Sequence, residues 1–285
     1  MGLLSGHQAA PEDFAQKVRT GGEIEAHYLA DGPCRTASQT MKALQEFGSF
    51  AIHYPKDLES SDKRYPVIVM CNGTGTPAEK YEAVFRHYAS WGFITIGTGE
   101  NHSWSGFGAE MCIRLLERLN SSEEFNRKKN IFFRKVDLGR VGICGHSQGG
   151  VGAINAVTDT RHKDIYKAAA VLSPTNRSLA HDLLWDYDPS GIKAPVMMMS
   201  GAGGGDDFVV NLDGLREIYD AVRSPKLMAR RAETPHGETL YSETGYVTAW
   251  FMWRLNGDAE AAKAFAGERP EIMENPMYQD QRMDL

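Results

Sequence analysis

The chain has 285 residues, of which 42% are hydrophobic and 24% charged, and this ordinary globular composition can bury a substantial core. Its 31 basic and 37 acidic residues give a formal net charge of -6 without a long block of either sign, which argues against nucleic acid as a partner. No apolar stretch approaches the roughly 20 residues that span a bilayer, and the first residues lack a secretory signal. We therefore expect a cytoplasmic protein with no membrane partner.

The N-terminal part combines a loose beginning with the first candidate strands. We expect residues 1–20 to form a weakly packed arm, followed by strands at residues 24–29 and 49–54. Residues 66–71 include the run Val-Ile-Val-Met, which is apolar at every position. Such a run suits a central strand that is covered on both faces.

From there on, expected strands and helices alternate along the chain. The further strands are 93–96, 140–144, 168–172, 195–199 and 227–231, and the helices are 78–90, 109–119, 149–158, 212–222 and 246–255. This alternation predicts one α/β domain over residues 1–285, with a mostly parallel sheet and helices on both faces. Residues 258–285 are expected to form a short helix and a tail. Sites in such sheets lie at the carboxyl ends of the strands.

Ser147 is the centre of the pentapeptide Gly145-His146-Ser147-Gln148-Gly149. The pattern Gly-x-Ser-x-Gly occurs by chance in roughly one chain in ten, but here it follows an expected strand and opens a helix of small residues, as a nucleophile turn requires. A serine at such a turn has a strained backbone, and Cβ atoms two residues away on either side would crowd it. The helix N-terminus points its partly positive end at a reacting carbonyl. We predict Ser147 as a nucleophile.

The base that activates this serine must be a histidine held by a carboxylate. In serine hydrolases built on such a sheet, the acid and then the histidine follow the serine along the chain. His236 comes after the last expected strand and just before the last helix. His162 and His181 lie in other connections, and His146 should diverge from its neighbour on a sharp turn. We therefore predict His236 as the base.

The acid is expected in the glycine-rich loop after the strand 195–199, where Asp206 and Asp207 are adjacent. An acid, one free position, two apolar residues and then a small polar residue is a frequent frame in such hydrolases. Residues 207–211 fit this frame, so we predict Asp207 and keep Asp206 as the alternative. The spare carboxylate would be solvated or would cap the following helix.

Two loops are candidates for holding the substrate. Attack on an ester creates an oxyanion that needs two N–H donors, for which we predict Gln148, after the nucleophile, and Thr74, with Gly75 as the alternative. Glycine at position 75 would let the backbone approach the substrate. In the loop 97–106, which leaves the neighbouring strand, His102 and Trp104 are candidates for the wall of the acyl pocket.

The sequence contains no His-Glu-x-x-His or other metal-ligand spacing, and no cofactor is expected. The glycine-rich acid loop mimics a dinucleotide motif, but Asp206 stands where its third glycine belongs and would repel a pyrophosphate. A small-molecule ester is the expected partner, and the oligomeric state stays open.

Several segments together resemble the dienelactone-hydrolase and polyester-hydrolase (cutinase-like) branch of the α/β-hydrolase superfamily. The segments are residues 71–75, 89–93, 141–150, 236–237 and 249–251, within a resemblance that spans about residues 48 to 257. It implies a carboxylic-ester hydrolase with an open site, since the stretch between residues 172 and 195 is too short for a large lid domain. Dienelactone hydrolases proper have a cysteine where this chain has Ser147, so the substrate does not carry over.

The leading hypothesis is a serine esterase that acts through a Ser-His-Asp triad and an acyl-enzyme intermediate. A thioesterase, an amidase or an acyltransferase with the same triad is the first alternative. A hydrolase fold that only binds a ligand is the second.

Overall fold

The structure is a computed structural model that describes residues 9–43, 45–203 and 205–285. Its strands are β1 (Thr36–Lys42), β2 (Ser49–Pro55), β3 (Tyr65–Cys71), β4 (Ile94–Thr98), β5 (Glu124–Phe125), β6 (Lys128–Lys129), β7 (Val136–His146), β8 (Tyr166–Leu172), β9 (Val196–Ala202), β10 (Lys226–Ala232) and β11 (Tyr278–Asp284). Within these described residues, one nine-stranded sheet has the order β1-β2-β4-β3-β7-β8-β9-β10-β11, and β5 and β6 form a small separate hairpin.

The sheet is mostly parallel, as predicted. The pairings from β4 through β3, β7, β8 and β9 to β10 are parallel. Antiparallel pairs close both edges, through β1 and β2 on one side and β11 on the other. This arrangement is compatible with an α/β-hydrolase fold, in which loops at the carboxyl ends of the parallel strands carry the site.

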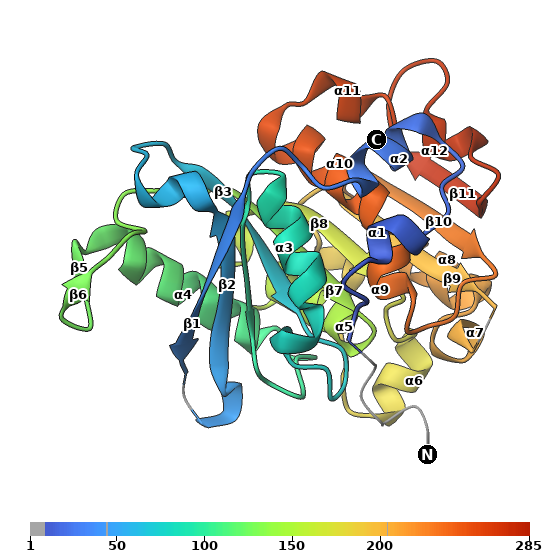
Figure 1. Cartoon of the computed structure of the whole chain (residues 1–285). Helices are drawn as coiled ribbons and strands as arrows, with labels where there is room; N and C mark the ends of the chain where they lie inside the picture. Colours follow the sequence, from blue (N-terminus) through green and yellow to red (C-terminus); the bar gives the residue numbers. More distant parts are fainter. Residues whose placement is uncertain (1–8, 44, 204) are drawn as a thin grey trace.

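Helices cover both faces of the sheet (Figure 1). They are α1 (Phe14–Lys17), α2 (Glu23–Leu29), α3 (Glu82–Ser90), α4 (Phe107–Ser121), α5 (Gln148–Thr158), α6 (Arg177–Asp182), α7 (Asp206–Val209), α8 (Leu212–Ala221), α9 (Thr239–Ser242), α10 (Thr244–Asn256), α11 (Ala259–Ala262) and α12 (Glu271–Glu274). Short 3-10 turns occupy Gln45–Phe47, Lys56–Glu59, Ala78–Tyr81, Lys163–Ile165 and Pro189–Gly191. Only α6 and one such turn lie between β8 and β9, where a lid would be inserted.

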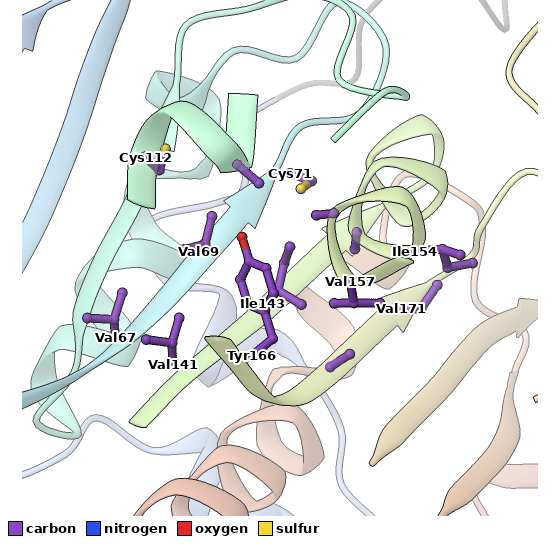
Figure 2. Packing of buried hydrophobic residues seen from close by; sticks show 14 of the residues in the cluster. Val67, Val69, Cys71, Cys112, Val141, Ile143, Ile154, Val157, Tyr166 and Val171 are labelled. Atoms are coloured by element: carbon purple, nitrogen blue, oxygen red, sulfur yellow. The ribbon is translucent and has the colours of Figure 1, made fainter. Parts of the chain in front are cut away.

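Alternation along β3 explains why its sequence is apolar throughout. Val67, Val69 and Cys71 point into the core layer beneath α4 and α5, whereas Ile68 and Met70 belong to the layer on the opposite face. Figure 2 shows the first layer, where Val141 and Ile143 of β7 lie beside the β3 side chains. Burial on both faces makes this strand a rigid support for the loops at its carboxyl end.

One expectation for the chain ends is wrong, and a second agrees with the structure in part. Residues 24–29 form the helix α2 rather than a strand, and the buried members Glu25, Tyr28 and Leu29 show the spacing of one helical face. Residues 258–285 contain the short helices α11 and α12, in line with the expected helix, but the expected tail ends in the edge strand β11 (Tyr278–Asp284), which pairs with β10. In the expected N-terminal arm, Phe14 is buried, and residues 1–8 lie outside the described residues.

In the described residues, no helix is long and apolar enough to cross a membrane. The cytoplasmic location stays a prediction. All four cysteines are free thiols; Cys71, Cys112 and Cys144 are buried, and Cys34 is partly buried.

Candidate active site

Ser147 lies at the tip of a sharp turn between β7 and α5. Its φ of 61° and ψ of -123° place a non-glycine residue in a strained conformation, as predicted. A Cβ at Gly145 would lie 1.9 Å from the carbonyl oxygen of Gly149, and one at Gly149 would lie 2.1 Å from that of Cys71. The two glycines therefore let the turn close against β3 and present the serine at the carboxyl edge of the sheet.

His236 connects the serine to a carboxylate. Its Nε2 lies 2.8 Å from Ser147 Oγ, and its Nδ1 lies 2.5 Å from Asp206 Oδ1. Because an ionised carboxylate can only accept hydrogen bonds, Nδ1 donates to Asp206 and Nε2 is left to accept the serine proton. Ser147 and His236 each expose 7% of their surface, whereas Asp206 is fully buried.

The prediction that Asp207 is the partner of His236 is wrong, and the alternative Asp206 makes that contact. Asp207 points away from His236 and accepts a hydrogen bond from Arg230 Nη2. Both residues lie in the first turn of α7, where successive side chains point in different directions, so only one of the two can face the histidine. The side chain of Asp207 is 56% exposed.

Asp206 is held by two further donors that the sequence did not single out. Ser173 Oγ donates to Asp206 Oδ2 at 2.9 Å, and the Gly201 N–H donates to the same oxygen at 2.5 Å. The Thr239 hydroxyl lies 3.0 Å from Ser173 Oγ and donates to the carbonyl oxygen of His236. A carboxylate with donors on both oxygens is fixed in orientation and keeps its negative charge toward the histidine.

His146 also supports the histidine, although sequence reasoning set it aside. Its Nε2 lies 2.9 Å from the carbonyl oxygen of His236, and the two rings lie 4.8 Å apart at an interplanar angle of 33°. The His146 side chain is fully buried. It therefore contacts the backbone of His236 rather than the reacting edge of the ring.

The loops after β3 and β4 meet beside the turn. The Gln148 side chain accepts from the Ser103 N–H at 2.9 Å, and Ser103 Oγ donates to the carbonyl oxygen of Asn72 at 2.5 Å. Asn72 in turn donates to the carbonyl oxygens of Thr98, at the end of β4, and of Glu100, in the loop that follows. These bonds tie the predicted donor loop, which includes Thr74, to the first turn of α5.

The backbone amides distinguish the two candidates for the second donor. The Gly75 N–H is already bonded to the carbonyl oxygen of Asn101 at 3.0 Å. For the N–H groups of Thr74 and Gln148, no backbone acceptor is found in the described part of the chain. Thr74 is thus the better placed of the two to offer a free donor.

The predicted pocket residues differ in their surroundings. His102 is exposed, whereas Trp104 is partly buried, packs against the core and accepts a hydrogen bond from Asn155 through its carbonyl oxygen. Glu100, at the start of the same loop, is 7% exposed and accepts from the Thr98 hydroxyl at 3.0 Å. Burial raises the pKa of Glu100 to about 7, against the opposing effect of that hydroxyl.

A second buried carboxyl group lies near the acid. Glu243 is fully buried, and both its carboxyl oxygens lack a hydrogen-bond partner among the described residues. Burial, and then the charge of Asp206, raise the pKa of Glu243 well above its ordinary value. In the same described residues, no group of three or more His, Cys, Asp or Glu side chains is arranged to hold a metal ion.

A mostly parallel sheet with helices on both faces, and a serine at a strained strand-turn-helix junction, define an α/β hydrolase. More particularly, the chain belongs to the PETase family, described as PET hydrolase-like, whose model matches residues 18–223. This confirms the predicted resemblance to polyester hydrolases and supports ester hydrolase activity. The match includes Ser147 and Asp206 and ends before His236. No curated protein matches the chain.

Proposed function

We propose that the protein hydrolyses carboxylic esters through Ser147, His236 and Asp206, by way of an acyl-enzyme intermediate. The observation that carries this proposal is the continuous chain of contacts, 2.8 Å from Ser147 Oγ to His236 Nε2 and 2.5 Å from His236 Nδ1 to Asp206 Oδ1. These distances lie within hydrogen-bond reach, the first requirement for proton transfer.

In the first half of the reaction, Ser147 Oγ attacks the ester carbonyl carbon while its proton passes to His236 Nε2. Asp206 stays ionised and stabilises the imidazolium that forms. The imidazolium then gives this proton to the leaving alkoxide, and the C–O bond of the ester breaks to leave the acyl group on Ser147. In the second half, His236 takes a proton from water, the resulting hydroxide attacks the acyl group, and Ser147 recovers its proton as the carboxylic acid leaves.

The negative charge on the carbonyl oxygen in both halves would be held by the backbone N–H groups of Gln148 and Thr74. The Gln148 amide lies at the N-terminus of α5, where the helix dipole adds to the stabilisation. Loss of one such donor costs roughly 100- to 1,000-fold in kcat in comparable sites. The contacts of Gln148 and Asn72 with Ser103 keep the two donor loops together.

The choice of test substrates follows the family, which is described as PET hydrolase-like. A first panel therefore contains soluble nitrophenyl esters of increasing acyl length, an aromatic diester and amorphous PET film. We expect turnover of the short nitrophenyl esters, since an open site accepts a small acyl group without a lid.

Nitrophenyl butyrate hydrolysis and covalent labelling by a fluorophosphonate probe test the proposal. The wild-type protein should hydrolyse the ester, and peptide mass spectrometry should find the probe on Ser147. Ser147→Ala should abolish both signals, whereas Ser121→Ala, at the exposed end of α4, should leave both unchanged. Absence of turnover together with absence of labelling in the wild type would refute the proposal. Competition between water and added alcohols or amines distinguishes a hydrolase from an acyltransferase.

A further inference from the structure

The loop after β9 presents two adjacent carboxylates, and Arg230 contacts Gly201 and Asp207, which stand before and after Asp206 in the chain. Arg230 lies on β10, and its side chain is only 7% exposed. Its Nη2 donates to Asp207 Oδ1 and, at 3.3 Å, to the carbonyl oxygen of Gly201. Asp206 lies between these two partners in the chain.

Gly201 links the arginine to the acid. Its carbonyl oxygen accepts from Arg230, while its N–H donates to Asp206 Oδ2 at 2.5 Å. Movement of the Gly201 backbone would therefore move a donor of the Asp206 carboxylate. On the other side, the ion pair with Arg230 holds Asp207, and so fixes the first turn of α7 from which Asp206 projects.

The C-terminal strand places another carboxylate beside the same guanidinium. The pairing of β10 with β11 shifts register between Met228 and Arg230, and Asp280 at this irregularity has a left-handed φ of 60°. Asp280 Oδ2 lies 3.6 Å from Arg230 Nη1. Arg230 is thus held by β11 while it contacts the acid loop.

We infer that Arg230 is a positioning residue for the proposed ester hydrolysis: it fixes Gly201 and Asp207 and so holds the Asp206 carboxylate against His236 Nδ1. The inference rests on the proposed function. Arg230 also balances the charge of Asp207, which would otherwise stand unpaired one residue from the negatively charged acid. Both Arg230 and Asp280 lie beyond the residues that the family model matches.

The test compares Arg230→Gln and Arg230→Lys with Arg282→Gln, which removes an exposed arginine that pairs with Asp220 at the same edge of the sheet. Because small misplacements of catalytic groups cost up to about 100-fold, we expect Arg230→Gln to lower kcat by roughly 10- to 100-fold with little change in KM. Arg230→Lys should recover part of kcat, and Arg282→Gln should match the wild type.

A second variant and a second readout keep the outcomes separate. Arg230→Gln combined with Asp207→Asn removes the unpaired charge and should regain part of the lost activity. The downfield proton NMR signal of His236 Nδ1–H should weaken in Arg230→Gln without any need for turnover. Unchanged kcat and an unchanged proton signal in the Arg230 variants of an active enzyme would overturn the inference. An inactive wild type that retains the proton signal would instead count against the proposed function. If Arg230→Gln does not fold, the same comparison with Arg230→Lys decides.

Discussion

His236 Nδ1 lies 2.5 Å from Asp206 Oδ1, whereas the carboxylate of Asp207, the residue after Asp206, accepts a hydrogen bond from Arg230. The two carboxylates therefore differ in environment despite their adjacency. Asp206 is fully buried with donors on both oxygens, and Asp207 is more than half exposed. Their substitution should separate the two roles.

Asp206→Asn should lower kcat by about 10,000-fold, since an amide in place of the carboxylate favours the wrong imidazole tautomer and cannot stabilise the imidazolium. Asp207→Asn should stay within a few-fold of the wild type, because the amide oxygen can still accept from Arg230, which also keeps its contact with Gly201. Initial rates with nitrophenyl butyrate measure both. Equal losses of kcat in the two variants would mean that the contact with His236 does not identify the catalytic acid.

The contrast between the serine turn and the acid loop explains which parts of the site could be predicted from the sequence. The turn around Ser147 is specified locally by Gly145 and Gly149, so its geometry could be predicted from five residues. The choice between Asp206 and Asp207 depends on which side chain of α7 faces His236, and the partner of Asp207, Arg230, lies on β10 and has no local sequence signal. The contact between Arg230 and Asp207 forms only when the folded sheet brings β10 beside the acid loop, so the local sequence does not predict it.

The same distinction applies to the fold. The central strands were predicted because burial on both faces leaves a continuous apolar run, as in β3 (Tyr65–Cys71). The edge strands β1 and β11 were not predicted, because each pairs on one side only and carries mostly polar residues. In α2, the apolar residues Ile24, Tyr28 and Leu29 fit either a short strand or one helical face, and packing against α10 favours the helix.

Gly149→Ala should destabilise the protein by about 3 kcal/mol or more, although alanine is the better helix former. Its Cβ would lie 2.1 Å from the backbone carbonyl oxygen of Cys71, which cannot yield without displacing β3. Gly139→Ala is the matched control in β7, because its Cβ would meet only the Asp137 side chain, at 3.2 Å. Urea denaturation measures both. A Gly149→Ala variant as stable as the control would contradict the close approach of β3 to the turn.

The thiols should differ sharply in reactivity. Burial raises the pKa of Cys71, Cys112 and Cys144, which are at most 2% exposed, so these three should resist a disulfide reagent in the folded protein at pH 8. Cys34 is partly exposed, and burial raises its pKa as well, so it should react slowly. Titration should count about one thiol in the native state and four in guanidinium. Cys34→Ser should remove the native reaction, and rapid native labelling of Cys144 would contradict the packing beneath the serine turn.

Glu100 should make the stability of the protein depend on pH. Its pKa rises from 4.5 in the unfolded chain to about 7 in the fold, so between these values the folded state holds the proton more tightly. The associated stabilisation is complete below pH 4.5 and is lost as the pH rises through 7. Glu100→Gln does not titrate and can keep the hydrogen bond from the Thr98 hydroxyl. Its free energy of unfolding, relative to the wild type, should therefore rise by about 3 kcal/mol from pH 4.5 to pH 8.

Urea denaturation of Glu100→Gln and the wild type at pH 4.5, 6 and 8 measures this difference. The comparison cancels the contribution of Glu243, since that buried carboxyl group is present in both proteins. Glu82→Gln, at the exposed start of α3, is the control in which no buried carboxyl group is replaced. A difference in the free energy of unfolding that stays constant across this pH range would mean that water reaches Glu100 in the folded protein. The loop that carries His102 and Trp104 would then be looser than its contacts with Asn72 and Gln148 imply.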